Sequence, residues 1–96
     1  MITVTIEKSR IKASGHAGAA PKGQDLVCAA FTMLCHSLIE SFGKLTGDSF
    51  IYKIDSGSFY FECALPSRQG ELLINSYIAG VQLLAASYPE YITVQA

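Results

Sequence analysis

Apolar and polar residues alternate at the start of the chain and predict two strands. In segment 2–6, isoleucine and valine alternate with threonine, the pattern of a strand with one buried face. After a short turn at 7–9, the alternation resumes over 11–13 in a second strand. Segment 15–24 is rich in glycine and small residues, which predicts a mobile loop with few side-chain contacts of its own.

A change to spacings of three and four residues marks the first predicted helix. Asp25 suits the N-cap of this helix, which we expect to run to about Phe42 and to be stopped by Gly43. Its buried stripe consists of five apolar residues at these spacings: Val27, Phe31, Leu34, Leu38 and Phe42.

The second half of the chain predicts a hairpin, a helix and a last strand. Segments 50–54 and 59–65 both alternate, with a turn at 55–57 between them. A second helix is expected from about Glu71 to Ser87, and a short strand over 92–94 closes the chain. The element order is therefore ββαββαβ. It predicts an α+β domain with two helices packed on one face of a mostly antiparallel five-stranded sheet.

The second predicted helix is apolar beyond a single stripe. The stripe consists of Ile74, Tyr77, Ile78, Val81, Leu84 and Tyr88, and four more apolar residues lie off it: Leu72, Leu73, Ala79 and Leu83. One interpretation is a helix sunk deep in its own core, and the other is a surface that a second copy of the chain covers. We favour the second interpretation.

Composition supports that preference and excludes several classes of protein. The 96 residues fit one domain, 1–96; half of them are hydrophobic, and only 16% are charged. With a mean hydropathy of +0.31, the chain has more apolar surface than one small core can hide, so we expect a homodimer. The net charge is −1 and the basic residues are scattered singly, which disfavours direct binding of nucleic acid.

Neither a membrane anchor nor export is predicted. The longest apolar stretch, Leu26 to Cys35, is interrupted by Thr32 and is far shorter than the ~20 residues that span a bilayer. The amino terminus has neither the basic start nor the continuous apolar core of a signal peptide, so we expect a cytoplasmic protein. Its three cysteines are then free thiols, and the absence of a CxxC spacing gives a metal site little support.

The candidate chemistry lies between residues 15 and 30. Cys28 follows the expected cap Asp25 by three residues, which places it in the first helical turn. There the helix dipole and unpaired N–H groups favour a thiolate and could receive an oxyanion. His16 closes the second strand and could exchange a proton with that thiol. Most cysteines near helix starts are nevertheless inert packing residues, and most single histidines have no catalytic role.

Two short strings in this region resemble a known family. GHAG at 15–18 and GQDLVCAA at 23–30, with Cys28 twelve positions after His16, are similar to the signature of the ribosomal-processing cysteine proteases, the Prp family. In that family a GHA motif is followed by a GxDIVCAA-like motif, and here Leu26 stands where isoleucine is usual. The specific match covers about sixteen residues, and the rest of the chain agrees in length and element order.

The resemblance implies a cytoplasmic, dimeric endopeptidase that needs no metal or organic cofactor. The family removes a short N-terminal extension from large-subunit ribosomal protein twenty-seven, cutting after an aromatic residue. Carried over to this chain, His16 is the general base, Cys28 is the nucleophile and Asp25 matches the acid of the motif. Asp25 either orients the imidazole or only caps the helix, and we favour the cap. The segment 18–23 is expected to order over the bound peptide.

The other thiols and the second histidine are expected to be structural. Cys35 shares a helix face with Cys28 and should pack inward, Cys63 alternates with core phenylalanines, and His36 should be a solvated helix-face residue. The alternative function is a non-catalytic, ribosome-associated protein-binding module in which Cys28 is merely packed. Selective alkylation of Cys28 separates the two hypotheses, because only a catalytic thiolate reacts at mildly acidic pH.

Overall fold

The computed structural model describes residues 1–15 and 22–96, without the side chains of 22–25. Its elements follow the predicted order, ββαββαβ, with these bounds: β1 (Ile2–Glu7), β2 (Arg10–Ser14), α1 (Lys22–Leu45), β3 (Ile51–Asp55), β4 (Ser58–Glu62), α2 (Arg68–Ser87) and β5 (Ile92–Gln95). The predicted fold class is confirmed.

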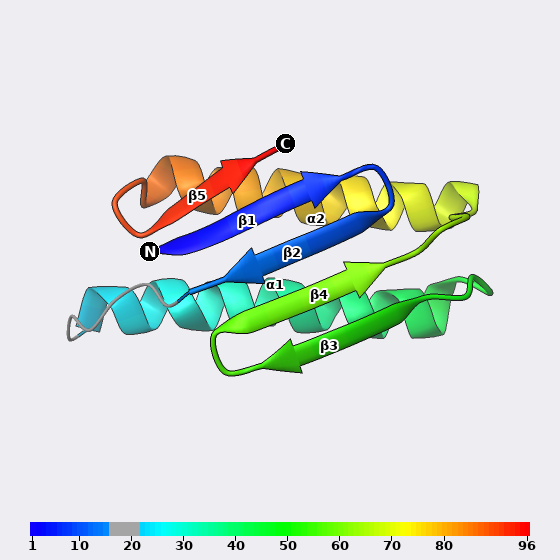
Figure 1. Ribbon diagram of the computed structural model, residues 1–96, viewed down its shortest axis with the longest axis horizontal. Helices are drawn as coiled ribbons and strands as arrows, with labels where there is room; N and C mark the ends of the chain where they lie inside the picture. Colours follow the sequence, from blue (N-terminus) through cyan, green and yellow to red (C-terminus); the bar gives the residue numbers. More distant parts are fainter. Residues whose placement is uncertain (16–21) are drawn as a thin grey trace.

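The five strands form one mixed sheet in the order β3-β4-β2-β1-β5 (Figure 1). β1 pairs with β2, β2 with β4 and β3 with β4, all antiparallel, whereas β5 lies parallel to β1. The parallel pair is possible because α2 carries the chain from the end of β4 across to the opposite edge of the sheet. The sheet therefore has two edges, β3 and β5.

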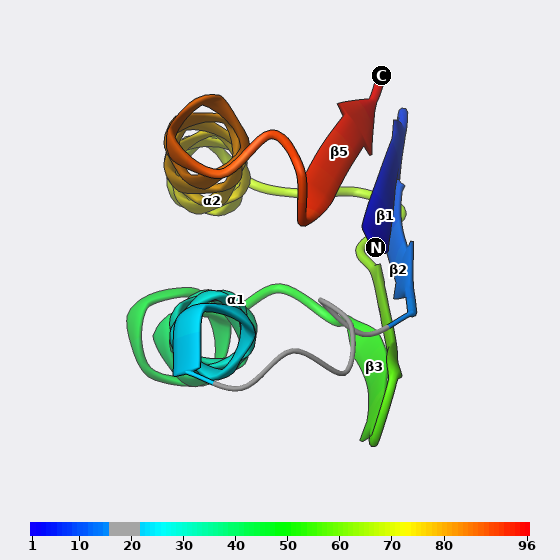
Figure 2. The same cartoon turned by 90° about the vertical axis from the view of Figure 1, so that its left-hand side faces the viewer.

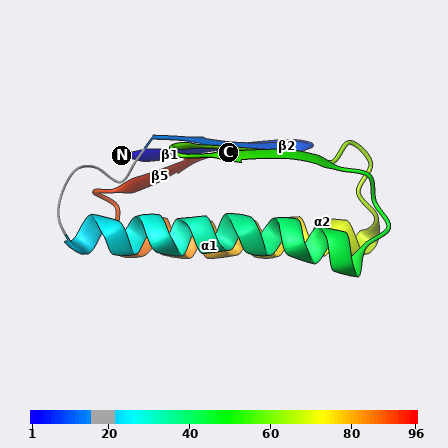
Figure 3. The ribbon, with the colours of Figure 1, turned by 90° about the horizontal axis from the view of Figure 1, so that it is seen from below.

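Both helices cover the same face of this sheet and leave the other face open (Figures 2 and 3). The strand register collects the apolar residues on the covered face: Val4 lies opposite Ala13, which in turn lies opposite Phe59. The residues between them, such as Thr3 and Lys12, are directed to the open face because side chains alternate along a strand.

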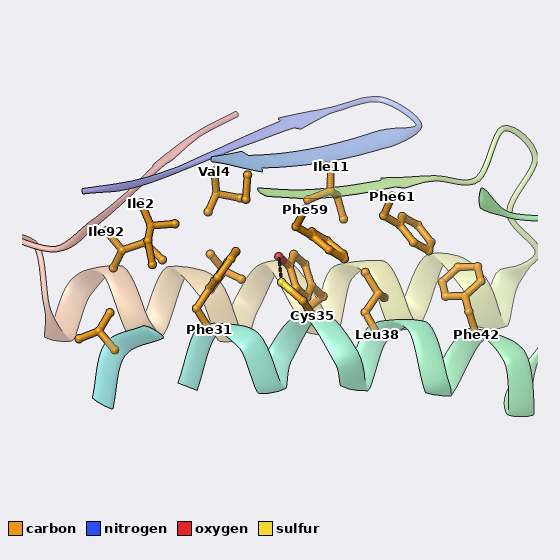
Figure 4. Close-up of a cluster of buried hydrophobic side chains, with 14 of the residues drawn as sticks. Ile2, Val4, Ile11, Phe31, Cys35, Leu38, Phe42, Phe59, Phe61 and Ile92 are labelled. Carbon is orange, nitrogen blue, oxygen red and sulfur yellow. Dashed lines mark hydrogen bonds between the residues drawn. The ribbon is translucent and has the colours of Figure 1, made fainter. Parts of the chain in front are cut away.

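The core lies between the sheet and the two helices (Figure 4). All residues of the predicted stripe of α1 contribute, with Val27, Phe31, Leu38 and Phe42 buried and Leu34 partly buried. Phe42 contacts Phe61 edge to face, with ring centroids 4.9 Å apart. Such aromatic pairs add stabilisation beyond the area that they bury.

One polar contact crosses this core. The Sγ of Cys35 on α1 and the phenol oxygen of Tyr77 on α2 are hydrogen-bonded at 3.4 Å, and both residues are buried. Burial raises the pKa of the Cys35 thiol to about 12 and also raises the pKa of Tyr77. Both groups therefore stay neutral at physiological pH and tie the two helices together.

The bounds of α1 correct two predictions. The helix begins at Lys22, so Asp25 is its fourth residue and not its N-cap, and the predicted loop 15–24 ends earlier. Lysine and glutamine are good helix formers, and the single glycine between them costs only about 1 kcal/mol. The helix also continues through Gly43 to Leu45. Gly43 has no positive φ, and the side chain of Thr46 instead hydrogen-bonds to the carbonyl of Phe42 at 2.9 Å.

The start of α2 also differs from the prediction. It begins at Arg68 and not at Glu71, because Ser67 is its N-cap and accepts a hydrogen bond from the N–H of Gly70. The strand before it is shorter than expected: β4 ends at Glu62, and Leu65 is 89% exposed. The proline at position 66 has no N–H for a strand ladder, so it bars a strand from continuing past Leu65.

Of the four apolar residues outside the stripe of α2, Leu73 is partly buried against the core and the other three are exposed. Leu72 and Leu83 are each 69% exposed, and Ala79 between them is also exposed. The interpretation of α2 as a helix buried on all sides is therefore wrong. Leu26–Leu45 of α1 is long and apolar enough to span a bilayer by length and composition alone, contrary to the shorter stretch read from the sequence. Its buried stripe lies in the core of the domain, and 28% of the most apolar window is buried.

Candidate active site

A cavity of about 510 Å³ opens where the end of β2, the turn between β3 and β4, and the N-terminal half of α1 meet. Its apolar lining includes Phe31, Ile54 and Phe59, and its polar lining includes Thr32 and Asp55. Two smaller cavities in the described part of the chain have volumes of about 320 and 80 Å³. The cavity of about 510 Å³ lies on the helix-covered side of the sheet. Its size is ample for one large side chain of a bound molecule.

Cys28 lines this cavity and is half-buried. It lies on the same face of α1 as Thr32 and His36, because residues at spacings of four and eight share a helix face. The other two thiols do not compete with it as nucleophiles. Burial holds the pKa of Cys35 at about 12 and raises that of Cys63, and Cys63 does not line the cavity. The prediction that both pack inward is confirmed, since each is buried.

Gly15 shapes the second wall of the cavity. It has a φ of 98°, a conformation that favours glycine, and a Cβ there would collide with the backbone of Met1. Its N–H donates a hydrogen bond of 2.9 Å to the carbonyl of Gly57, which joins the end of β2 to the hairpin turn. The residue that immediately precedes His16 in the sequence is therefore part of the cavity wall.

The side chains of the other two predicted site residues, His16 and Asp25, lie outside the described part of the chain. His16 belongs to residues 16–21, which the structure does not describe, as does most of the segment 18–23 that is expected to order over a peptide. Asp25 lies three residues before Cys28 within α1, but only its backbone is described. The bounds of α1 do change one expectation. Cys28 is the seventh helical residue, beyond the first turn whose N–H groups lack partners, so those groups do not surround the thiol.

His36 is exposed, as predicted, but it also lines the cavity, which the sequence reasoning missed. The spacing of Cys28, Thr32 and His36 could have revealed the shared face. The sequence could not have predicted that Asp55 and Ser58 of the hairpin turn also line the cavity, because their position depends on the packing of the sheet against α1. Eight residues of helix separate Cys28 from His36 by about 12 Å, too far for a direct hydrogen bond. Within the described part of the chain, no three metal-binding side chains cluster.

Comparisons with known proteins agree with this arrangement. The family model described as "Cysteine protease Prp" matches residues 1–93 of the chain. The ribosomal processing cysteine protease Prp of Mycoplasma pneumoniae is 31% identical over 104 residues, covering 99% of this chain and 94% of that protein. The enzyme of the same name from Bacillus subtilis is 31% identical over 109 residues, with coverage of 98% and 96%.

Solved structures share the fold over nearly the whole chain. The ribosomal processing protease Prp from S. aureus, in complex with a covalently linked product peptide, superposes with a TM-score of 0.87 at 22% identity, covering 99% of this chain and 98% of that one. The S. aureus protease in complex with a substrate peptide gives a TM-score of 0.79 at 17% identity, with coverage of 98% and 95%.

Together the half-buried thiol in its cavity and these relatives define a cysteine protease, a hydrolase of peptide bonds. More particularly, the chain belongs to the Prp family of ribosomal processing cysteine proteases. The resemblance read from the sequence is confirmed. The alternative of a non-catalytic binding module has no support, because the curated relatives that cover the chain are proteases.

Proposed function

We propose that this protein removes the short N-terminal extension of large-subunit ribosomal protein twenty-seven, cutting after an aromatic residue, with Cys28 as nucleophile and His16 as general base. The observation that carries the proposal is the cavity that holds Cys28 and whose wall ends at Gly15. Its apolar lining, with Phe31, Ile54 and Phe59, has the chemistry to accept an aromatic side chain.

The reaction follows from a thiol and an imidazole at this cavity. His16 takes the proton of Cys28, and the sulfur attacks the scissile carbonyl carbon to form a tetrahedral intermediate. As the carbon–nitrogen bond breaks, His16 returns the proton to the leaving amine, and a thioester remains on Cys28. Water, deprotonated by His16, then attacks the thioester and restores the thiol. The helix bounds do not support oxyanion binding by the first turn of α1, so those donors must come from another part of the cavity wall.

The residue that completes the catalytic group is His16 rather than His36. His36 lies about two helical turns beyond Cys28, out of reach of the thiol. Gly15, next to His16 in the sequence, lies in the cavity wall. Asp25 has lost its capping role, because the helix begins three residues before it. It therefore acts as a positioning residue for His16, the remaining role for the acid of the motif.

Incubation with the extended ribosomal protein, read by mass spectrometry, tests the function. Wild-type protein should release the extension, and Cys28→Ala and His16→Ala should each lower kcat by about 10⁴-fold or more. Cys35→Ala is the matched control, since it removes a thiol from the same helix that is buried and hydrogen-bonded to Tyr77, and it should retain activity. Near-wild-type turnover by Cys28→Ala would end the proposal.

The protein is further proposed to act as a homodimer in the cytoplasm, through the exposed apolar stripe of α2 formed by Leu72, Ala79 and Leu83. Burying such a stripe against its own copy removes apolar surface from water. Sedimentation should show a dimer for the wild type and a monomer for Leu83→Glu. Gln82→Glu, with the same added charge on a neighbouring exposed position, should stay dimeric. A monomeric wild type would refute this part.

A further inference from the structure

β3 is an edge strand of the sheet, next to the candidate active site. It pairs with β4 on one side, and no strand in the described part of the chain pairs with its other side (Figure 1). An unpaired edge presents a row of backbone N–H and C=O groups that can hydrogen-bond an added extended chain. Extended peptides are recognised in this way by several kinds of domain.

The hairpin register determines which residues present these groups. A two-residue turn, Ser56 and Gly57, joins the paired residues Asp55 and Ser58, and in a hairpin of this kind the two residues that flank the turn form a hydrogen-bonded pair. Bonded and non-bonded pairs alternate along an antiparallel ladder, so the backbones of Tyr52 and Ile54 are directed away from β4. Each residue has one N–H and one C=O, and the edge therefore offers two donors and two acceptors.

The side chains of these same two residues lie on the helix-covered face. Tyr52 pairs with Phe61 and Ile54 with Phe59, and both phenylalanines are core residues. Tyr52 is half exposed and stacks on Phe50, with ring centroids 6.2 Å apart. A peptide added along β3 would therefore place every second side chain beside Tyr52 and Ile54, on the side where α1 lies (Figure 2).

The edge leads directly to the nucleophile. Ile54 and Asp55, at the end of β3, line the cavity together with Cys28. A chain that follows β3 toward the hairpin turn would enter that cavity.

We propose that the substrate peptide binds as an added strand on β3, hydrogen-bonded to the backbones of Tyr52 and Ile54, and is thereby delivered to Cys28. This inference rests on the proposed function, since it describes how the same site holds its substrate. A backbone clip of this kind binds peptides of varied sequence, while the cavity beside it selects the side chain at the cut.

The occupant of this edge is the substrate rather than a second copy of the chain. The apolar stripe assigned to the dimer lies on α2, and α2 covers the end of the sheet opposite β3 (Figure 2). A dimer formed there leaves β3 open. The end of this edge, at Ile54 and Asp55, also lines the cavity of Cys28. A peptide bound there lies next to the nucleophile, which is the position that a substrate must occupy.

A scan of methylated peptides tests the clip without altering the protein. Synthetic peptides spanning the cleavage site of the extension carry one N-methyl group each, which removes one backbone donor and adds bulk. Wild-type cleavage should be weakened about tenfold or more at every second residue over the stretch along β3, and little at the residues between. No alternation, with the unmethylated peptide still cleaved, overturns the proposal alone. Failure to cleave the unmethylated peptide refutes the proposed function instead.

A pair of variants tests the same contact from the side of the enzyme. Tyr52→Pro removes the outward N–H, and proline is tolerated where an edge N–H faces solvent. Tyr52→Ala removes the side chain but keeps the N–H. KM for the unmethylated peptide should rise about five- to tenfold more in Tyr52→Pro than in Tyr52→Ala, with similar kcat and melting temperature.

Two results would overturn the proposal. One is equal KM values for folded Tyr52→Pro and Tyr52→Ala. The other is a shift from dimer to monomer in Tyr52→Pro with KM unchanged, which would make β3 the contact between copies. If Tyr52→Pro does not fold, the methylated peptides decide the question, because they leave β3 intact.

Discussion

Replacing Gly70 with alanine should destabilise this protein, although alanine is the better helix former. Gly70 is a buried residue in the first turn of α2. A Cβ there would overlap the Oδ2 atom of Asp48 and lie 3.2 and 3.3 Å from two ring carbons of Phe42. The carboxylate is held in place, because Oδ2 accepts hydrogen bonds from the backbone N–H of Ser67 at 2.9 Å and from its hydroxyl at 2.8 Å.

The expected change in the free energy of unfolding follows from the hydrogen bonds that the Asp48 carboxylate loses when it moves. Moving Asp48 weakens two hydrogen bonds to a charged group, each contributing about 1.5–3 kcal/mol at most and less in this partly exposed setting. The gain in helix propensity from glycine to alanine offsets about 1 kcal/mol of this loss in stability. The net loss is then about 1–3 kcal/mol. For a domain of this size, it corresponds to a fall in melting temperature of about 5–20 °C.

Thermal and urea denaturation of four variants give the measurement: Gly70→Ala, Gly43→Ala, Asp48→Ala and the double variant of Asp48 and Gly70. Gly43→Ala is the matched control, because Gly43 lies in α1 with nothing within 4 Å of an added Cβ, so it should stabilise by about 0.5–1 kcal/mol. In an Asp48→Ala background, the loss caused by Gly70→Ala should shrink, since the overlapping atom is gone. The reasoning is refuted if Gly70→Ala raises the melting temperature as Gly43→Ala does.

Three further outcomes are expected. In the folded protein at pH 8, iodoacetamide should label Cys28 but not Cys35, because burial raises the pKa of the Cys35 thiol to about 12. Peptide mapping should find Cys35 labelled only after denaturation, and equal labelling rates of the two thiols would contradict the burial of Cys35. Tyr77→Phe should lower the free energy of unfolding by about 1 kcal/mol through loss of the contact with Cys35, measured by urea denaturation, while cleavage stays unchanged. Asp25→Asn should leave the melting temperature unchanged, because the residue is not a cap, but should lower kcat/KM at least tenfold and shift its pH profile; an unchanged rate would leave Asp25 without a part in catalysis.

Local sequence patterns were sufficient for most of the fold. Alternation over 2–6 and 59–61 and the stripe from Val27 to Phe42 each reflect burial on one side of an element, so they predicted the strands and α1. The spacing of His16 and Cys28 within two short strings was enough to indicate the family. The ends of elements were predicted less well. The cap at Ser67 depends on Asp48, nineteen residues away, and α1 extends upstream of the good cap residue Asp25.

The surroundings of Cys28 were decided only by the tertiary structure. The string around Cys28 contains nothing about the turn between β3 and β4, yet Asp55 and Ser58 from that turn line the same cavity. They arrive there because β4 pairs with β2, and because Gly15 at the end of β2 hydrogen-bonds to Gly57. Likewise, the alternation of β3 gives no sign of whether the strand lies inside the sheet or at its edge. Long-range pairing sets the strand order, and that order leaves the backbones of Tyr52 and Ile54 open beside the cavity.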